Sequence, residues 1–382
     1  MALTIRRLLD FLLHGPLRYC PLHFGAYRPR PQWRLCKTCL EPDPKRIVPL
    51  GPVAAETVPV EHAFQVDRSR TDPAGIPTCP KGHASYHPCC PDTRCHAQLP
   101  ADPATGANAI AIHGWPAAGK SHYFVSLYRQ LKRYSQKHGG YVFQDGSEVS
   151  RLTLAEMEDT VFEKRQPLEP TQPGDPTGYY LRVSLPRELR RPRRPVVRFV
   201  FYDPAGELHK SVEIHRLAGY LAHAPVVMIL VGADSLAPLR TRASRPDETL
   251  EALCNNVETT IRTALGTRVN RKVNRTLVVL VTKADLMKLH LPKEAFSTMR
   301  AEWPSPAQIE QHQQAVARAL GEWEPGIVNW ARTSFREVGF FAASALGTPP
   351  VQGTLPSVEP VGVVAPFLWA LQRRRLARRR LR

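Results

Sequence analysis

The chain has 382 residues, 43% of them hydrophobic, which is long enough for one large core with a smaller module beside it. Its formal net charge of +18 makes nucleic acid and anionic membrane surfaces candidate partners. No uncharged apolar run of about 18 residues occurs, so we expect no transmembrane helix and a cytoplasmic protein.

The first 17 residues combine Arg6 and Arg7 with several leucines, and Asp10 interrupts the apolar run. A secretory signal requires a longer apolar stretch than this. The segment is therefore predicted to form an amphipathic helix.

Seven of the eight cysteines lie in the first 95 residues. In a reducing compartment such clustering favours metal binding over disulfides. Cys36 and Cys39 have the C-x₂-C spacing of a zinc knuckle, and thiolates and imidazoles at such spacings suit tetrahedral Zn²⁺. Residues 1–105 are therefore predicted to form a small zinc-ribbon-like module, in which a structural Zn²⁺ supplies much of the folding free energy. Buried, reduced cysteines are the alternative.

The predicted zinc ligands are Cys36, Cys39, Cys79, His83, Cys90 and Cys95. One set would consist of Cys36, Cys39, Cys90 and Cys95, and a second site would use Cys79 and His83. The sequence leaves this pairing open.

Residues 107–382 alternate apolar runs with helical patterns, which predicts an α/β domain built from βαβ units around a mostly parallel sheet. The expected strands are 109–113, 179–185, 196–202, 226–231, 277–281 and 339–342, and the expected helices are 120–138, 249–265, 305–321 and 366–381. Strands 179–185 and 196–202 flank a basic loop, so we expect them to form an antiparallel hairpin at one edge of the sheet.

A phosphate-binding loop is predicted between the first expected strand and its helix. Residues 114–121 read G-x-x-x-x-G-K-[ST] in the strand–helix context that this motif requires. Gly114 and Gly119 allow backbone N–H groups to surround a β-phosphate, and Lys120 adds a positive charge. The Ser121 hydroxyl can bind Mg²⁺. The predicted loop comprises Gly114, Trp115, Pro116, Ala117, Ala118, Gly119, Lys120 and Ser121, followed by His122.

A second motif, Asp-Pro-Ala-Gly-Glu, starts at Asp203 directly after the strand 196–202. A carboxylate at this strand end suits Mg²⁺, and the N–H of Gly206 would bind the γ-phosphate and move when that phosphate leaves. Asp203 and Gly206 are therefore predicted to belong to the same nucleotide site.

A base-reading motif, Thr282–Lys283–Ala284–Asp285, follows the strand 277–281. A carboxylate at Asp285 can accept hydrogen bonds from N1–H and the N2 amine of guanine, and adenine lacks this pair of donors. The Lys283 stem can lie over the base. A further turn with Ser344 and Ala345 follows the last strand, where a backbone N–H can reach O6 of guanine.

These four ordered motifs resemble those of the TRAFAC-class P-loop GTPases over about residues 107–370. More narrowly, the chain resembles the bacterial double-GTPase families, in which a cysteine-rich ribbon precedes the phosphate-binding loop. The resemblance implies a P-loop GTPase-like three-layer sandwich over residues 107–382, GTP or GDP and Mg²⁺ as ligands, and hydrolysis of GTP. It also implies protein partners, including a second GTPase encoded nearby, and a role in biological conflict systems.

One departure from the GTPase pattern concerns hydrolysis. Glu207 stands where Ras-like enzymes carry a glutamine that orients water, so we expect slow or partner-stimulated hydrolysis. The resemblance also calls for a Mg²⁺-binding threonine in the first switch, and Thr171 is preferred over Thr177. Lys120, Glu207 and Thr171 are thus the predicted catalytic residues, and Ser121, Thr171 and Asp203 the predicted Mg²⁺ ligands.

The last ten residues contain seven arginines. This end could touch anionic lipid or nucleic acid, or could be a solvated helix end. Three functions therefore remain: a GTP-dependent switch, a nucleotide-bound scaffold that hydrolyses little, and a nucleic-acid-binding protein that depends on zinc and arginine.

Overall fold

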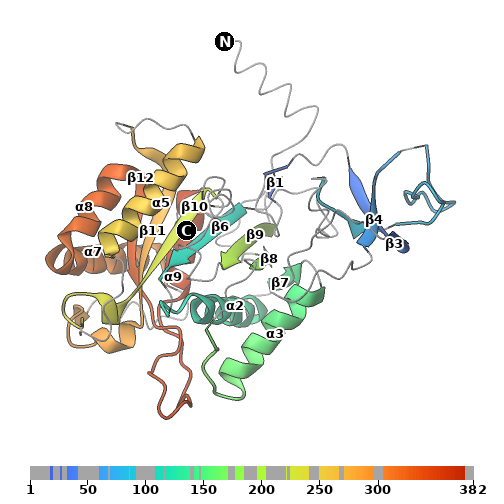
Figure 1. Cartoon of the computed structure of the whole chain (residues 1–382). Helices are drawn as coiled ribbons and strands as arrows, with labels where there is room; N and C mark the ends of the chain where they lie inside the picture. The colour runs from blue at the N-terminus through green and yellow to red at the C-terminus, as the bar shows by residue number, and fades with distance from the viewer. Residues whose placement is uncertain are drawn as a thin grey trace.

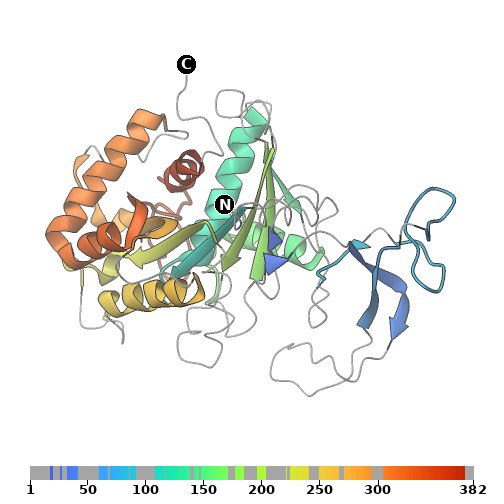
Figure 2. The same ribbon diagram turned by 90° about the horizontal axis from the view of Figure 1, so that it is seen from above.

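The computed structural model describes residues 18–19, 26–27, 32–41, 60–67, 69–85, 87–91, 108–115, 117–137, 142–145, 148–170, 177–184, 196–203, 221, 224–240, 249–265, 271–293, 295 and 304–374. Figures 1 and 2 show a large sheet with helices on both faces, and a small sheet to one side of it. The predicted helix over residues 1–17 and the predicted boundary near residue 105 lie outside these ranges.

The large sheet has seven strands in the order β12-β11-β10-β6-β9-β8-β7. Their bounds are β6 Asn108–Gly114, β7 Val142–Asp145, β8 Thr177–Ser184, β9 Val196–Asp203, β10 Val226–Gly232, β11 Val273–Thr282 and β12 Phe335–Ala342. The five strands from β12 to β9 run parallel, and β8 is antiparallel to both of its neighbours. The predicted, mostly parallel sheet is confirmed.

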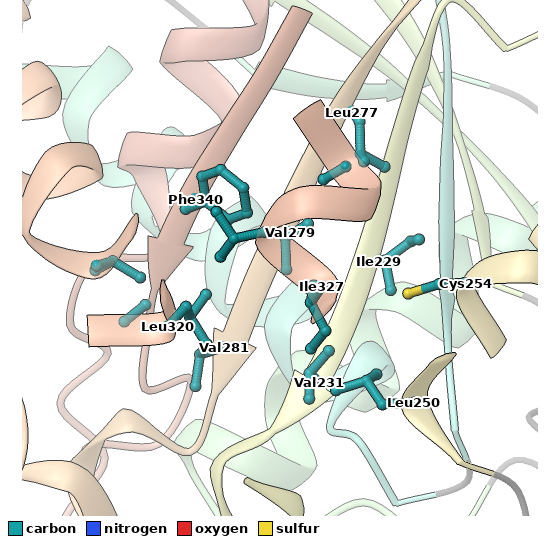
Figure 3. Packing of buried hydrophobic residues seen from close by; sticks show 14 of the residues in the cluster. Ile229, Val231, Leu250, Cys254, Leu277, Val279, Val281, Leu320, Ile327 and Phe340 are labelled. Atoms are coloured by element: carbon teal, nitrogen blue, oxygen red, sulfur yellow. The ribbon is translucent and has the colours of Figure 1, made fainter. Parts of the chain in front are cut away.

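The described helices are α2 Lys120–Lys137, α3 Glu148–Phe162, α5 Leu250–Leu265, α7 Pro306–Trp323, α8 Pro325–Ser334 and α9 Val364–Arg373. Alternate residues of β10 point into two different cores, as strand geometry requires. Val227, Ile229 and Val231 pack with α5, α7 and α8, whereas Val226, Met228 and Leu230 pack with α2 and α9. Figure 3 shows the first core, in which Ile229 and Val231 face Leu250 and Cys254. The domain is thus a three-layer α/β sandwich, as predicted.

Three elements of this domain were not predicted. Strand β7 has four residues, too few for a clear alternation, and it pairs with β8 so that the β8–β9 hairpin is not the edge of the sheet. In helix α3 the contacts with the core come from few residues, such as Leu154 and Val161. Helix α8 starts at Pro325 and is separated from the end of α7 by Glu324 alone, and a proline is well placed at the first position of a new helix.

The small sheet is antiparallel and has the order β4-β3-β5, with β3 Trp33–Glu41, β4 Val60–Gln65 and β5 His87–Pro88. A two-stranded ribbon, β1 Arg18–Tyr19 and β2 Ala26–Tyr27, precedes it. The buried cluster of the small sheet contains only Cys36, Cys39, Phe64 and Cys79 among the described residues. So small an apolar core contributes little folding free energy by itself.

Across the part of the chain that the structure describes, none of the helices has the length and apolarity that crossing a membrane requires.

The buried imidazole of His312 connects α7 with the end of β12 and predicts a pH-dependent stability. Its Nδ1–H donates to the carbonyl of Ala295 at 3.2 Å, and its Nε2 accepts from the N–H of Ala342 at 3.1 Å, so the ring is neutral. Burial lowers the pKa of His312 to about 4, although the hydrogen bonds to Ala295 and Ala342 raise it.

Because this folded-state pKa lies below the ordinary value of 6.5, His312 stabilises the fold fully above pH 6.5, and the contribution is lost as pH falls towards 4. The free energy of unfolding should fall by up to about 1.4 kcal/mol per pH unit for this one histidine in that window. The free energy of unfolding, measured with urea at several pH values, should change less per pH unit in His312→Gln than in the wild type. An equal change per pH unit in both proteins would contradict the assignment.

Candidate functional site

The phosphate-binding loop leaves the carboxyl end of β6 at the centre of the sheet. Gly114 approaches β10 so closely that a Cβ there would lie 2.4 Å from the carbonyl oxygen of Leu230. Gly119 has φ +76°, the left-handed region that glycine tolerates best. The two glycines of the motif are therefore both required by the backbone, one by close approach and one by its conformation.

The ammonium group of Lys120 lies inside the curve of this loop. Its Nζ donates to the carbonyl of Gly114 at 3.2 Å and to that of Trp115 at 3.1 Å, and the side chain is buried. Lys120 starts α2, so its charge lies at the positive end of a helix dipole. Together they form a site for an anion. Pro116, the remaining predicted loop residue, lies outside the described residues.

The base-reading motif lies directly beside this loop. The Thr282 hydroxyl donates to the carbonyl of Ala118 at 2.7 Å and also lies 3.2 Å from the carbonyl of Val231. A threonine here therefore ties the end of β11 to the phosphate-binding loop.

Asp285 is oriented by the turn after β12. The Ser344 hydroxyl donates to Oδ1 of Asp285 and accepts from the N–H of Gly347 at 2.8 Å. The backbone N–H of Ser344 donates to Val361 at 2.9 Å. Ser344 therefore acts on the carboxylate through its side chain, a role that the sequence did not indicate.

Lys283 forms an ion pair that the sequence did not predict. It adopts a left-handed conformation with φ 54°, and its Nζ lies 2.7 Å from Oδ2 of Asp234. Asp234 follows β10, in the short helix η2 Ala233–Ser235. Strands β10 and β11 are paired up to Gly232 and Thr282, so both motif ends reach the same edge of the sheet. The sequence feature that could have indicated this ion pair is the position of Asp234 just beyond the buried strand β10.

A cavity of about 470 Å³ joins these parts at the carboxyl ends of the parallel strands. This is where ligands bind in open α/β sheets. Its wall is formed by four groups of residues: 117 and 119–122 around the phosphate-binding loop; 234, 282–283 and 285–286 beyond β10 and β11; 344–346 and 348–350 after β12; and 167–170. Three of the four predicted motifs thus line one cavity.

His122 also lines this cavity, and its Nε2 accepts a hydrogen bond from the N–H of Leu168 at 2.9 Å. Burial and, to a smaller extent, the charge of Lys283 lower the pKa of His122 to about 4. The ring is therefore neutral near pH 7, with its proton on Nδ1. The sequence placed His122 in the site but assigned it no contact.

The predicted magnesium side of the site is described only in part. Asp203 ends β9, which is the neighbour of β6 in the sheet, so its backbone lies at the same edge as the phosphate-binding loop. Thr177 is its partner on β8. Thr171, Gly206 and Glu207 lie outside the described residues, and the assignments of Mg²⁺ ligands stay predictions.

In the small sheet, four side chains converge on one point. The ligand atoms of Cys36, Cys39, Cys79 and His83 all lie within 4.8 Å of one another. The predicted set that combined Cys36 and Cys39 with Cys90 and Cys95 is wrong in Cys90, which is buried but not part of this group. Cys95 lies outside the described residues.

The reason for the different grouping is a tight turn. The N–H of Cys79 donates to the carbonyl of His83 at 2.9 Å, and the N–H of Gly82 donates to the carbonyl of Cys79 at the same distance. This turn carries Cys79 and His83 together to the irregular part of β3 between Cys36 and Leu40. Cys36 and Cys39, which the sequence assigned to one site, and Cys79 and His83, which it assigned to a second, therefore form a single group.

Several solved structures are similar to this chain. The signal recognition particle receptor SRb-GTP/SRX complex from Chaetomium thermophilum is 12% identical, with 65% of this chain and 95% of that chain covered and a TM-score of 0.31. The S. cerevisiae Ski7 GTPase-like domain bound to GTP is 15% identical, with 66% and 48% covered and a TM-score of 0.30. The chain thus spans about half of the Ski7 structure. No curated protein sequence matches.

The family comparison covers the phosphate-binding loop, the switch motif and the base-reading motif together. The model of the family described as Double-GTPase 2 matches residues 108–326, from the first strand of the large sheet to the start of α8. This is more than half of the 382 residues. The chain belongs to the Double-GTPase 2 family.

Proposed function

We propose that this protein is a guanine-nucleotide-binding switch that uses Mg²⁺ and hydrolyses GTP to GDP and phosphate, slowly or with stimulation by a partner. The observation that carries the proposal is a single cavity with Lys120 and Asp285 both in its wall. The ammonium of Lys120 suits the phosphates, and the carboxylate of Asp285 suits the guanine edge. Membership of the Double-GTPase 2 family supports the same reading.

Different residues of the cavity would contact different parts of the guanine base. Asp285, oriented by Ser344, can accept both guanine donors, and the Lys283 stem, held by Asp234, can lie along the base. Because the N–H of Ser344 already donates to the carbonyl of Val361, the N–H of Ala345 is the better donor to O6 of guanine. A site built on such hydrogen bonds rejects bases that lack them.

Mg²⁺, when bound, neutralises charge that develops on the phosphates during hydrolysis. Ser121 lines the cavity and is our first candidate ligand, with Asp203 and Thr171 as the others. Gly206 is proposed as the sensor of the γ-phosphate. Glu207 cannot offer the amide donor of the glutamine common at its position, which favours a stimulated reaction and also keeps a non-hydrolysing scaffold as the second candidate function.

We further propose one structural Zn²⁺ in the small sheet. Tetrahedral Zn²⁺ with Zn–S distances of about 2.3 Å places its sulfur ligands about 3.8 Å apart. The Sγ atoms of Cys39 and Cys79 are 3.8 Å apart, and Nδ1 of His83 is 3.7 Å from Cys79 Sγ and 3.9 Å from Cys36 Sγ. The donor set and its spacing therefore fit this ion.

Partners are proposed on family grounds: a second GTPase encoded nearby, within a bacterial conflict system. Contact of the arginine-rich end with nucleic acid or anionic membrane stays a prediction, because residues 375–382 lie outside the described residues.

Binding of fluorescent GDP, competed separately by GTP and ATP, tests the nucleotide proposal. We expect GTP to compete and ATP to fail, and Lys120→Ala to weaken binding by roughly a hundredfold, because a buried charge contact to phosphate is lost. Arg133→Ala is the matched control, since it removes an exposed positive charge from the same helix. Equal competition by ATP would overturn the assignment of guanine. Multiple-turnover phosphate release separates the switch from the scaffold.

A further inference from the structure

One wall of the cavity is a segment that the four nucleotide motifs do not include. Residues 163–170 follow α3, and 167–170 line the same cavity as Lys283 and Asp285. We call residues 163–170 the strap. In the chain it directly precedes Thr171 of the predicted first switch. Because it forms part of the cavity wall, a movement of the strap would change access to the cavity.

A side chain of the phosphate-binding region holds the strap. The N–H of Leu168 donates to Nε2 of His122 at 2.9 Å, and His122 is the second residue after Lys120 in α2. The Leu168 side chain is half-buried and packs against the core under α2. The strap is thus attached to the helix that begins at the phosphate-binding loop.

A second element holds the strap from the other side. The loop between β12 and α9, residues 343–363, is closed on itself by the pairing of Ser344 with Val361 and by the hydrogen bond from the Glu359 N–H to Leu346. The N–H of Leu355 in this loop donates to the carbonyl of Arg165 in the strap at 2.8 Å. The strap and the loop therefore meet, and both contribute wall residues to the cavity.

We propose that His122 is a positioning residue that latches the strap across the cavity and so sets the rate at which nucleotide leaves. The inference rests on the proposed guanine-nucleotide function. Several contacts restrain the strap. Near its start, Arg129 donates to Glu163, Arg165 donates to the carbonyl of Pro356, and the Leu355–Arg165 bond joins two backbone groups. At the end that lines the cavity, the Leu168–His122 bond depends on one side chain. Loss of the imidazole removes the acceptor for the Leu168 N–H and frees the strap near the phosphate-binding loop.

The chemistry of the latch requires a neutral ring with an acceptor at Nε2. The imidazole is largely buried, and the charged groups that line the cavity with it are Lys120, Lys283, Asp234, Asp285 and Glu169. A glutamine places its carbonyl oxygen near the position of Nε2 and can keep the hydrogen bond. Alanine has no acceptor and cannot keep this hydrogen bond. A comparison of the two substitutions therefore shows whether the hydrogen bond itself matters.

The test is the dissociation of preloaded fluorescent GDP, chased with excess GDP, from the full chain and from His122→Ala and His122→Gln. We expect His122→Ala to speed release by about tenfold, the effect of losing one buried hydrogen bond, with a smaller change in the association rate constant. His122→Gln should stay close to wild type. Equal release from wild type and His122→Ala, or equal acceleration in both variants, would overturn the latch.

Hydrogen exchange of the peptide spanning residues 163–170, measured without nucleotide, tests the latch independently of the proposed nucleotide binding. Exchange at Leu168 should rise in His122→Ala and not in His122→Gln. If GDP does not bind any of the three proteins, the proposed function fails, and the exchange result still decides whether His122 holds the strap. Unchanged exchange in His122→Ala would rule the latch out.

Discussion

Replacing Asp285 with asparagine is expected to change the preferred base from guanine to xanthine. In the proposed site the carboxylate would accept two hydrogen bonds from guanine, whereas asparagine presents one acceptor and one amine donor. Against guanine this amine faces the N2 amine, but xanthine has an oxygen at that position and matches it. The hydrogen bond from Ser344, which orients the carboxylate, can persist with the asparagine oxygen.

The expected change in relative affinity is roughly a thousandfold, because a desolvated hydrogen-bonding site rejects a mismatched group strongly. Competition of fluorescent GDP by unlabelled GDP and XDP measures it. Asp234→Asn is the matched control, since it makes the same chemical change at another carboxylate of the same cavity, one that pairs with Lys283. Its base preference should stay with guanine. Equal weakening of GDP and XDP binding in Asp285→Asn would show that Asp285 does not read the base.

Removal of zinc is expected to unfold the small sheet. Structural Zn²⁺ contributes about 10–16 kcal/mol in small zinc modules, and the buried cluster here holds three cysteines and one phenylalanine. Cys39→Ser replaces a ligand near the centre of the group, whose Sγ lies 3.2 Å from Nδ1 of His83. The purified chain should contain one zinc ion, and the variant should lose it and become sensitive to proteolysis within residues 32–91.

Cys90→Ser is the control for this experiment, because Cys90 is equally buried but lies outside the group of four. It should keep its zinc ion, whereas the ligand set first drawn from the sequence required Cys90 to bind the metal. Zinc retained in Cys39→Ser, or lost in Cys90→Ser, would refute the ligand set of Cys36, Cys39, Cys79 and His83.

The sequence alone was sufficient for the parts of the site that are local. The loop from Gly114 to Ser121 is one strand–helix junction, and its glycines, lysine and flanking elements are all contiguous. The hydrogen bond from Thr282 to Ala118 joins this loop to the end of β11, because the carboxyl ends of the parallel strands meet at one edge of the sheet. The short strand β7 and the helix α3 were missed, because four residues or a weak apolar stripe give no clear period. Helix α8 was missed because only Glu324 separates it from α7.

Contacts between residues far apart in the chain could not be predicted from the sequence. Cys39 and Cys79 are separated by 40 positions, His122 and Leu168 by 46, and Asp234 and Lys283 by 49. Composition and local periodicity carry no information on which of several similar side chains will meet, since that depends on strand order and on the folding of the connecting loops. The motifs at single strand–helix junctions were therefore predictable from the sequence. The packing of distant segments brings Cys79 and His83 to Cys36 and Cys39, pairs Lys283 with Asp234, and joins Leu168 to His122.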